Sequence, residues 1–390
     1  GLSGLQKEYD SELRGTPGYI ISKAPAEGSG TSTVLKEEVA NDGVQLTVTL
    51  DIALQELAET ALADQTGPAS LVAIRPSTGE VLVVANSPGS NWYDTALLGQ
   101  YPPGSTFKLV SSLALLRAGL TPESTLPCTA GVTVDGKTFN NYSDFPSGST
   151  GDIPLASALA LSCNTAFISQ YDVVSQQDLA DAAAALGVGQ ELDLGTEAFA
   201  GSVPADSAGT AHAAAMIGQG DVLVSPLDMA VVAASIAAGH KVTPTLVSLP
   251  EGYAAADGAD GAEAADGAEA ADGDQASDAP AADGSAAAGE SAAAGVGADL
   301  SITADEGSTL FTMMRGVVQT GTASVLRDLP GEIGAKTGTA EYGNTNPPST
   351  HAWMVAISGD LAVAVFVEGG ASGSGTAGPI MRAFLEGAHG

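Results

Sequence analysis

The sequence predicts an α+β (α/β) fold in which helices cover an antiparallel sheet. Strand patterns occur near both ends of the 390-residue chain, at 44–50 and 69–86 and again at 350–358 and 361–370. The stretch between them, about 105–240, is rich in apolar helical patterns. Because short turns join the paired strands into hairpins, the sheet is expected to be antiparallel. Its faces must then be buried under helices.

Local signals support the individual elements. Asp51 is placed to cap a helix over 52–64, whose apolar residues recur at helical spacing. The Val-rich hairpin 69–86 turns at the Pro-Ser-Thr-Gly sequence of 76–79. An amphipathic helix over about 378–387 is expected to close the chain.

Composition divides the chain into parts. Residues 1–44 hold a short amphipathic stretch, a turn, a short strand and a polar loop, which is too little for a core. Residues 45–390 form the main domain. Within it, 251–300 consist almost entirely of Ala, Gly, Asp, Glu and Ser. Such a segment does not bury enough apolar surface to offset its ordering entropy, so we predict a disordered acidic insertion in a surface loop. An interaction tail is the functional alternative.

Charge and composition exclude several classes of function. Lysine and arginine total 13 against 46 acidic residues, a formal net charge of -33, so a nucleic-acid partner is not expected. The histidines have no cysteine or carboxylate at ligand spacing, so we expect no metal and no cofactor. The longest apolar run, from Met229, is shorter than the ~18 residues of a membrane span and predicts a buried helix. No signal segment opens the chain, so a membrane anchor would have to precede position 1.

Ser105 and Lys108 are the first candidate catalytic pair. They stand in "YPPGSTFKLV", where a Pro-Pro-Gly turn precedes a helix predicted to begin at Ser105, and their spacing puts both side chains on one helix face. The helix N-terminus offers a positive dipole and free N–H groups to a developing oxyanion. The lysine can accept the serine proton only if burial or a second cation lowers its pKa. Taken alone, the pattern is also that of a helix cap beside a surface lysine.

Two further patterns could complete such a site. In "ALALSCNTAF", Ser162 and Asn164 could relay a proton and hold a substrate carbonyl, although alone they would read as helix-end capping residues. In "IGAKTGTAEYG", Lys336 lies on a predicted strand and would be the second cation beside Lys108. A glycine in a strand, here Gly338, often marks the close approach of another backbone.

The string TGTA occurs twice, at 320–323 after Gln319 and at 337–340 after Lys336. Because a glutamine supplies no cation, we interpret the first copy as the end of a helix with Gly321 as its C-cap. Its expected role is structural, or a position on the rim of the site at most.

Ser-x-x-Lys, Ser-x-Asn and Lys-Thr-Gly, each present once and in this order, resemble the motif set of penicillin-binding proteins and class A β-lactamases. The segments "LTVTLD", "AIRPSTGEVL", "IGQGDVLVSPLDMA" and "HAW" are similar to the transpeptidase domain of penicillin-binding proteins over about 45–390, except for the insertion. The N-terminal "GLSGLQKEYDSELRGTPG" resembles the segment before this domain in class B (monofunctional) members. The resemblance implies a five-stranded antiparallel sheet covered by helices, an all-helical subdomain, and residues 1–44 as the remnant of a pedestal or dimerisation-type region and linker.

The resemblance also implies a serine D,D-transpeptidase that cross-links peptidoglycan stem peptides and that β-lactams acylate at Ser105. In this resemblance Ser105 is the nucleophile and Lys108 its general base. Ser162 relays the proton, and the amide of Asn164 positions the donor. Lys336 and Thr337 bind the substrate carboxylate. The backbone N–H groups of Ser105 and Thr339 would form the oxyanion hole. The substrate would bind along Thr337, Gly338 and Thr339 as an added β-strand.

Class B members are membrane-anchored and face the cell exterior, so the resemblance implies the same location here, with a glycosyltransferase as a partner protein. It implies a role in cell-wall synthesis during division or elongation, between which the sequence does not choose.

Several alternatives share part of this chemistry. A β-lactamase needs fast deacylation, but no Glu-x-x-Leu-Asn follows Ser162, and YGN at 342–344 stands on the wrong side of Lys-Thr-Gly for a class D enzyme. A bifunctional class A protein needs a glycosyltransferase domain, for which 1–44 is too short. A D,D-carboxypeptidase and a sensor that acylates without turnover remain open.

Cys128 and Cys163 are the whole cysteine complement. They are compatible with one disulfide or with two buried thiols. Because Cys163 lies inside the second motif, we hypothesise a bridge that fixes the loop carrying Ser162 and Asn164.

Overall fold

The computed structural model describes residues 4–24, 31–143, 145–248, 300–343 and 348–390. The acidic insertion predicted at 251–300 lies outside the described residues, apart from its last position. The described residues belong to one compact unit.

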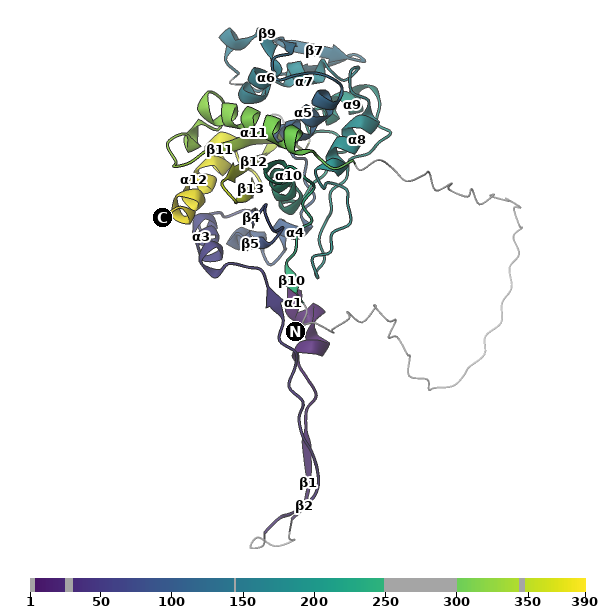
Figure 1. Cartoon of the computed structure of the whole chain (residues 1–390), viewed down its shortest axis with the longest axis vertical. Coiled ribbons are helices and arrows are strands. Elements are labelled where there is room, and N and C mark those ends of the chain that lie inside the picture. Colours follow the sequence, from purple (N-terminus) through teal and green to yellow (C-terminus); the bar gives the residue numbers. More distant parts are fainter. Residues whose placement is uncertain (1–3, 25–30, 144, 249–299, 344–347) are drawn as a thin grey trace, which may run out of the picture. The chain divides into compact units, whose positions relative to one another are not determined.

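A five-stranded antiparallel sheet in the order β11-β12-β13-β4-β5 lies at the centre of this unit (Figure 1). The predicted hairpin forms β4 (Ala69–Ile74) and β5 (Val81–Asn86). The C-terminal part supplies β11 (Ile333–Tyr342), β12 (Ser349–Ser358) and β13 (Ala362–Val367). Pairing of β13 with β4 joins strands from the two ends of the sequence, so the predicted sheet is confirmed. It leaves β11 as an edge strand.

Helices cover both faces of the sheet (Figure 1). On one face pack α10 (Pro226–Ala238) and α11 (Ala304–Gln319), and on the other α3 (Ile52–Leu62) and α12 (Gly378–Ala388). Because both faces are covered, every residue of β4 and β13 is buried. The carboxylate of Asp51 caps α3 as predicted, accepting from two backbone N–H groups of the first turn.

The middle of the chain contains strands as well as helices. Its helices are α4 (Thr95–Leu98), α5 (Lys108–Arg117), α6 (Leu155–Leu161), α7 (Asn164–Ile168), α8 (Gln176–Ala185) and α9 (Gly209–Ala215). Two small antiparallel sheets interrupt them, made by β6 (Thr125–Cys128) with β9 (Gly151–Pro154) and by β7 (Gly131–Val134) with β8 (Lys137–Asn140).

The prediction of an all-helical subdomain was therefore wrong. Val132 and Val134 flank Thr133, and Asp135 and Gly136, which follow, both adopt positive φ, at 46° and 80°. An Asp-Gly pair in this conformation is the two-residue hairpin turn that matches strand twist. The signal was present in the sequence.

The N-terminal part forms α1 (Gly4–Glu8), α2 (Asp10–Leu13) and a hairpin of β1 (Tyr19–Lys23) with β2 (Thr33–Glu38). All side chains of this hairpin are exposed, in agreement with the expectation that 1–44 has no core. The strand predicted at 44–50 shrinks to β3 (Thr47–Val48), which pairs with β10 (Val247–Ser248) outside the main sheet. Among the described helices, none has the length and apolarity needed to cross a membrane.

Candidate active site

Ser105 lies in a 3-10 turn, Gly104–Phe107, directly before α5. Lys108 is the first residue of α5, so the helix begins three residues later than predicted and a tighter turn carries the serine. The Nζ of Lys108 lies 3.0 Å from the Oγ of Ser105. The spacing read from the sequence therefore brings the hydroxyl and the amine into hydrogen-bond contact.

Backbone groups of this turn and of the residues before it bond to the segment after α9 and to β12. The Gly104 N–H donates to the Gly218 carbonyl at 2.9 Å, and the indole N–H of Trp353 donates to the Pro102 carbonyl at 3.0 Å. Gly104 has a φ of +52°, and a Cβ there would lie 2.7 Å from the carbonyl oxygen of Thr339. Both the conformation and the close approach require glycine. The backbone of β11 thus lies directly beside Ser105.

Lys108 is fully buried and joins the first two motifs. Its Nζ contacts Ser105 Oγ, the Ser162 carbonyl at 2.9 Å and the Asn164 Oδ1 at 2.7 Å. Burial, together with the nearby charge of Lys336, holds the pKa of Lys108 well below its usual range. A neutral amine beside a hydroxyl is a proton acceptor, as general-base chemistry requires.

Lys336 joins the third motif to the second. It is fully buried on β11, and its Nζ donates to the Oγ of Ser162 at 2.9 Å and to the Thr337 carbonyl at 2.8 Å. Burial lowers the pKa of Lys336 to about 7. A hydrogen-bonded series therefore runs from Ser105 through Lys108 and Ser162 to Lys336.

Ser162 adopts a left-handed conformation, with φ +58° and ψ 37°, at the C-terminus of α6. A left-handed conformation is uncommon for a residue with a Cβ, and it persists where contacts with the surrounding structure hold the backbone in place. The next residue begins the link to α7, whose first N–H groups, of Asn164 and Thr165, donate to the Oδ1 of Asn141 at 2.8 and 3.2 Å. The amide of Asn164 donates to the Asn140 carbonyl at 3.0 Å.

Asn140 and Asn141 were missed in the sequence. They lie at the end of β8 and fix both the backbone and the side chain of Asn164. The hairpin of β7 and β8 is the one signal that could have indicated them. A hairpin brings the end of its second strand back to the start of its first, and β7 starts just after Cys128, which is bonded to Cys163.

Cys128 and Cys163 form a disulfide. Both are fully buried, and the bond ties the last residue of β6 to the residue between Ser162 and Asn164. The second motif is therefore held covalently as well as by hydrogen bonds.

β11 forms one wall of the cleft, with Thr337, Thr339 and Glu341 alternating along it. The Thr339 Oγ1 accepts from the Gly373 N–H at 3.2 Å. A Cβ on Gly338 would lie 2.8 Å from the Pro103 carbonyl, so the glycine lets β11 pack on the Ser105 turn, as the sequence suggested.

The first TGTA copy contributes to the same wall. The hydroxyls of Thr322 and Thr337 lie 2.5 Å apart, and both line the cleft. The prediction of Gly321 as a helix C-cap was wrong, because Thr320 is the C-cap of α11. A Cβ on Gly321 would lie 2.1 Å from the Ala160 carbonyl, so a close approach explains this glycine.

The cleft has two lobes that meet at Ser105. The first, about 450 Å³, includes Ser162, Thr322 and Thr337, and we call it the motif lobe. The second, about 740 Å³, is walled by β8, the segment after α9 and the end of β11, and we call it the outer lobe. Asn164 and Thr339 line both lobes.

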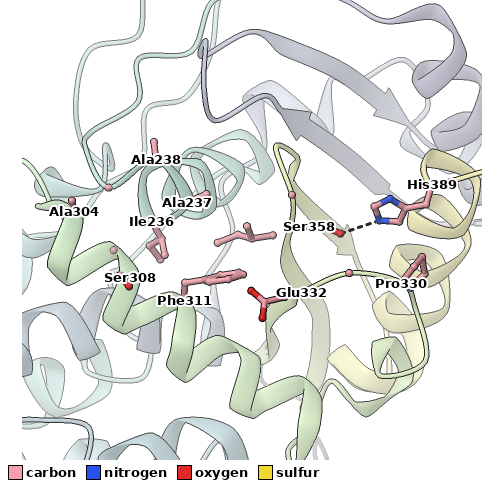
Figure 2. Close-up of a pocket in the computed structure, with 15 residues that line it drawn as sticks. Ile236, Ala237, Ala238, Ala304, Ser308, Phe311, Pro330, Glu332, Ser358 and His389 are labelled. Atoms are coloured by element: carbon pink, nitrogen blue, oxygen red, sulfur yellow. Dashed lines mark hydrogen bonds between the residues drawn. The ribbon is translucent and has the colours of Figure 1, made fainter.

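A separate apolar cavity of about 760 Å³ lies between the ends of α10, α11 and α12 (Figure 2). Three of its polar side chains have partners: Ser358 Oγ and His389 Nε2 lie 2.9 Å apart, and Glu332 pairs with Arg315 at 2.9 Å. No residue of the three motifs lines it, so the chemistry belongs to the cleft. Among the described residues, no three His, Cys, Asp or Glu side chains form a metal-binding group.

The geometry agrees with comparisons to known proteins. The family model of the penicillin-binding protein transpeptidase domain matches residues 69–386. The chain belongs to this family. As the sequence predicted, this penicillin-binding protein transpeptidase is a class B member with the corresponding fold.

The peptidoglycan D,D-transpeptidase PbpA of Mycobacterium tuberculosis is 29% identical to this penicillin-binding protein over 82% of the chain and 66% of the relative. The chain thus spans about two thirds of that relative's length. An imipenem acyl-enzyme complex of M. tuberculosis penicillin-binding protein A is similar with a TM-score of 0.69 and 25% identity, covering 90% of this chain and 80% of the other. A chain of a peptidoglycan synthase complex that coordinates polymerization and crosslinking has a TM-score of 0.74 and 25% identity, over 99% and 70%.

Proposed function

We propose that this chain is a serine D,D-transpeptidase that cross-links peptidoglycan stem peptides. The observation that carries the proposal is the buried series from Ser105 through Lys108 and Ser162 to Lys336. Burying two lysines costs free energy, and lysines with strongly lowered pKa values beside a serine are typical of a catalytic site. The names and acyl-enzyme states of the relatives support the same reaction.

In the acylation step, neutral Lys108 accepts the proton of the Ser105 hydroxyl while Oγ attacks the carbonyl between the two terminal D-alanines. The oxyanion that forms accepts hydrogen bonds from the backbone N–H groups of Ser105 and Thr339. The C–N bond then breaks, and the proton passes from Lys108 through Ser162 to the leaving amine of D-alanine. An ester on Ser105 remains.

In the second step, an acceptor amine attacks this ester. Its proton returns through Ser162 and Lys108 to the Ser105 oxygen as the ester bond breaks, which restores the enzyme and completes a new peptide bond. Before acylation, Lys336 and Thr337 hold the carboxylate of the donor peptide. The donor backbone pairs with the edge of β11 at 337–339, and the Asn164 amide holds the donor from the other side.

Residues 1–44 are proposed to be the remnant of an N-terminal pedestal region. We expect the enzyme to act at the outer face of the cell membrane, on wall polymer. The likeness to a chain of a synthase complex that couples polymerization to crosslinking supports a glycosyltransferase partner.

The proposal is tested with a D-Ala-D-Ala donor peptide and a primary-amine acceptor, with Ser105→Ala as the control. The expected result is Ser105-dependent release of D-alanine together with an amide-linked product. Hydrolysis without transfer to the amine would indicate a carboxypeptidase. A stable penicillin adduct without any D-alanine release would indicate a sensor.

A further inference from the structure

Two short strings of the sequence have no role in the reaction proposed above: His-Ala-Trp at 351–353 and Tyr-Gly-Asn at 342–344. In the structure Tyr342 is the last residue of β11, and His351 lies near the start of β12. Their rings stack, with centroids 3.9 Å apart and an angle of 5° between the planes. Neither side chain is among the residues that line the cleft, so this contact lies outside the reaction centre.

The stack continues to the segment that carries the nucleophile. Tyr101, which directly precedes the Pro-Pro-Gly turn before Ser105, meets the ring of His351 edge-on, with centroids 5.1 Å apart. The Tyr101 ring also stacks on Phe366 of β13 at 4.1 Å. Aromatic pairs in these arrangements are favourable beyond the apolar area that they bury. Tyr101, Tyr342, His351 and Phe366 therefore form one unit, which we call the ring cluster.

The ring cluster lies on the sheet face that receives the Ser105 turn. Ala340 pairs with His351 across β11 and β12, and the side chains of such a pair share a face. Tyr342 is the next residue of β11 on that face. A Cβ on Gly104, beside Ser105, would lie 3.0 Å from the Cβ of Ala340. The nucleophile turn thus packs on β11 directly next to the ring cluster.

His351 is a costly residue for this place. It is buried, and within the described part of the chain its Nδ1 has no hydrogen-bond partner. Burial lowers the pKa of His351 to about 4, so the ring is neutral at neutral pH. A buried nitrogen without a partner calls for an explanation in a native structure. The ring contacts with Tyr342 and Tyr101 are the favourable interactions that offset its cost.

Thr339 lies between two anchors of β11. Toward the start of the strand, the Thr337 hydroxyl contacts that of Thr322. Toward its end, Tyr342 is held by the ring cluster. The N–H of Thr339, a proposed donor of the oxyanion hole, has to lie about 3 Å from the reacting oxygen, and a misplacement of about 1 Å can cost about a hundredfold in rate. The second anchor also contacts the segment before Ser105, so it fixes the two partners of this geometry relative to each other.

Building on the proposed function, we propose that Tyr342 and His351 are positioning residues whose stack, through Tyr101, holds the Thr339 N–H beside Ser105. Neither side chain touches the substrate or transfers a proton. The oxyanion forms in both acylation and deacylation, so loss of the stack slows both steps. It should therefore lower kcat for D-alanine release and leave KM for the donor nearly unchanged.

The test compares Tyr342→Leu with Tyr342→Phe in the release of D-alanine from the D-Ala-D-Ala donor peptide. Tyr342 is partly exposed, so neither variant opens the core. Leucine removes the ring and should lower kcat by about tenfold, whereas phenylalanine keeps the ring and should retain the wild-type kcat. Rates are expressed per active site titrated with penicillin. Phe384→Leu, a buried ring on α12 outside the ring cluster, should lower the thermal midpoint without lowering kcat.

A double-variant cycle gives the second readout. His351→Leu should lower kcat as Tyr342→Leu does, and the double variant should be hardly slower than either single one, because the two rings act as one unit. Wild-type kcat in the leucine variants, an equal loss in Tyr342→Phe or Phe384→Leu, or losses that simply add in the cycle would overturn the inference and leave the proposed function standing. Absence of both D-alanine release and penicillin acylation in wild type would overturn both.

Discussion

Lys108 and Lys336 bind the same serine from two sides: the Nζ of Lys108 lies 2.9 Å from the carbonyl oxygen of Ser162, and the Nζ of Lys336 lies 2.9 Å from its Oγ. Burial lowers the pKa of both amines, and the charge of Lys336 lowers the pKa of Lys108 further. The arrangement keeps a basic amine next to Ser105 at neutral pH.

The pH dependence of donor turnover should be bell-shaped. The rising limb reports loss of the proton from Lys108, because only the neutral amine can accept the proton of Ser105. The falling limb reports loss of charge from Lys336, whose pKa is about 7, because a neutral amine binds the donor carboxylate less well. Measuring kcat/KM from about pH 5 to 10 checks both limbs.

Replacing Lys336 by methionine should change this profile in a defined direction. Without the second cation the pKa of Lys108 rises, so the rising limb moves to higher pH, and the falling limb disappears. Lys7→Met, on exposed α1, is the control and should keep the wild-type profile. An unshifted rising limb in Lys336→Met would show that the two lysines do not interact.

Gly338→Ala should slow acylation by about tenfold or more, because a Cβ there would lie 2.8 Å from the Pro103 carbonyl and would displace the Ser105 turn. Gly316→Ala is the matched control: its Cβ meets nothing within 4 Å on α11. This control should retain activity and gain up to about 1 kcal/mol of stability. Acylation rates and thermal midpoints of the two variants check the prediction. Wild-type acylation by Gly338→Ala would contradict the close packing.

Removing the disulfide should lower both stability and acylation rate. Cys128→Ala with Cys163→Ala frees the residue between Ser162 and Asn164 from β6, with an expected loss of about 2–4 kcal/mol. Denaturant unfolding and the rate of penicillin acylation measure the two effects. Reductant should mimic the double variant in wild type and have no effect on the variant itself. Alkylation of wild type without reductant should add no mass.

Thr322→Val should raise KM for the donor more than it lowers kcat, because Thr322 supports the Thr337 hydroxyl that is proposed to hold the carboxylate. Thr320→Val, two residues away and exposed, is the control, since its hydroxyl bonds only within α11, to the Gly316 carbonyl. Equal KM and kcat values for the two variants would show that the first TGTA copy has a purely structural role.

The sequence predicted the main sheet because its signals are local. The hairpin 69–86 and the strands 350–358 and 361–370 combine a strand pattern with a turn of known type, and all three are present. The stretch 44–50 had the same alternation, but β3 keeps only two residues of it, because its partner β10 is equally short. Pairing length depends on the partner, which a single strand pattern does not specify.

The three motifs were readable because each is contiguous in sequence. Asn141 was not, since it acts on Asn164, 23 positions away, and carries no charge or pattern of its own. Thr322 stands in the first TGTA copy, for which a rim position was the most that was expected, and its bond to Thr337, 15 positions away, became visible only in the fold. Hydroxyl and amide partners of this kind are recognised only when the fold brings them together.

The site and rate of penicillin acylation test the proposed roles of Ser105 and Lys108 most directly. Wild-type protein treated with penicillin G should carry a stable adduct on the peptide that contains Ser105, and Lys108→Ala should form it at least about a hundredfold more slowly. An adduct on another residue, or an equally fast reaction in Lys108→Ala, would contradict the proposed roles of Ser105 and Lys108.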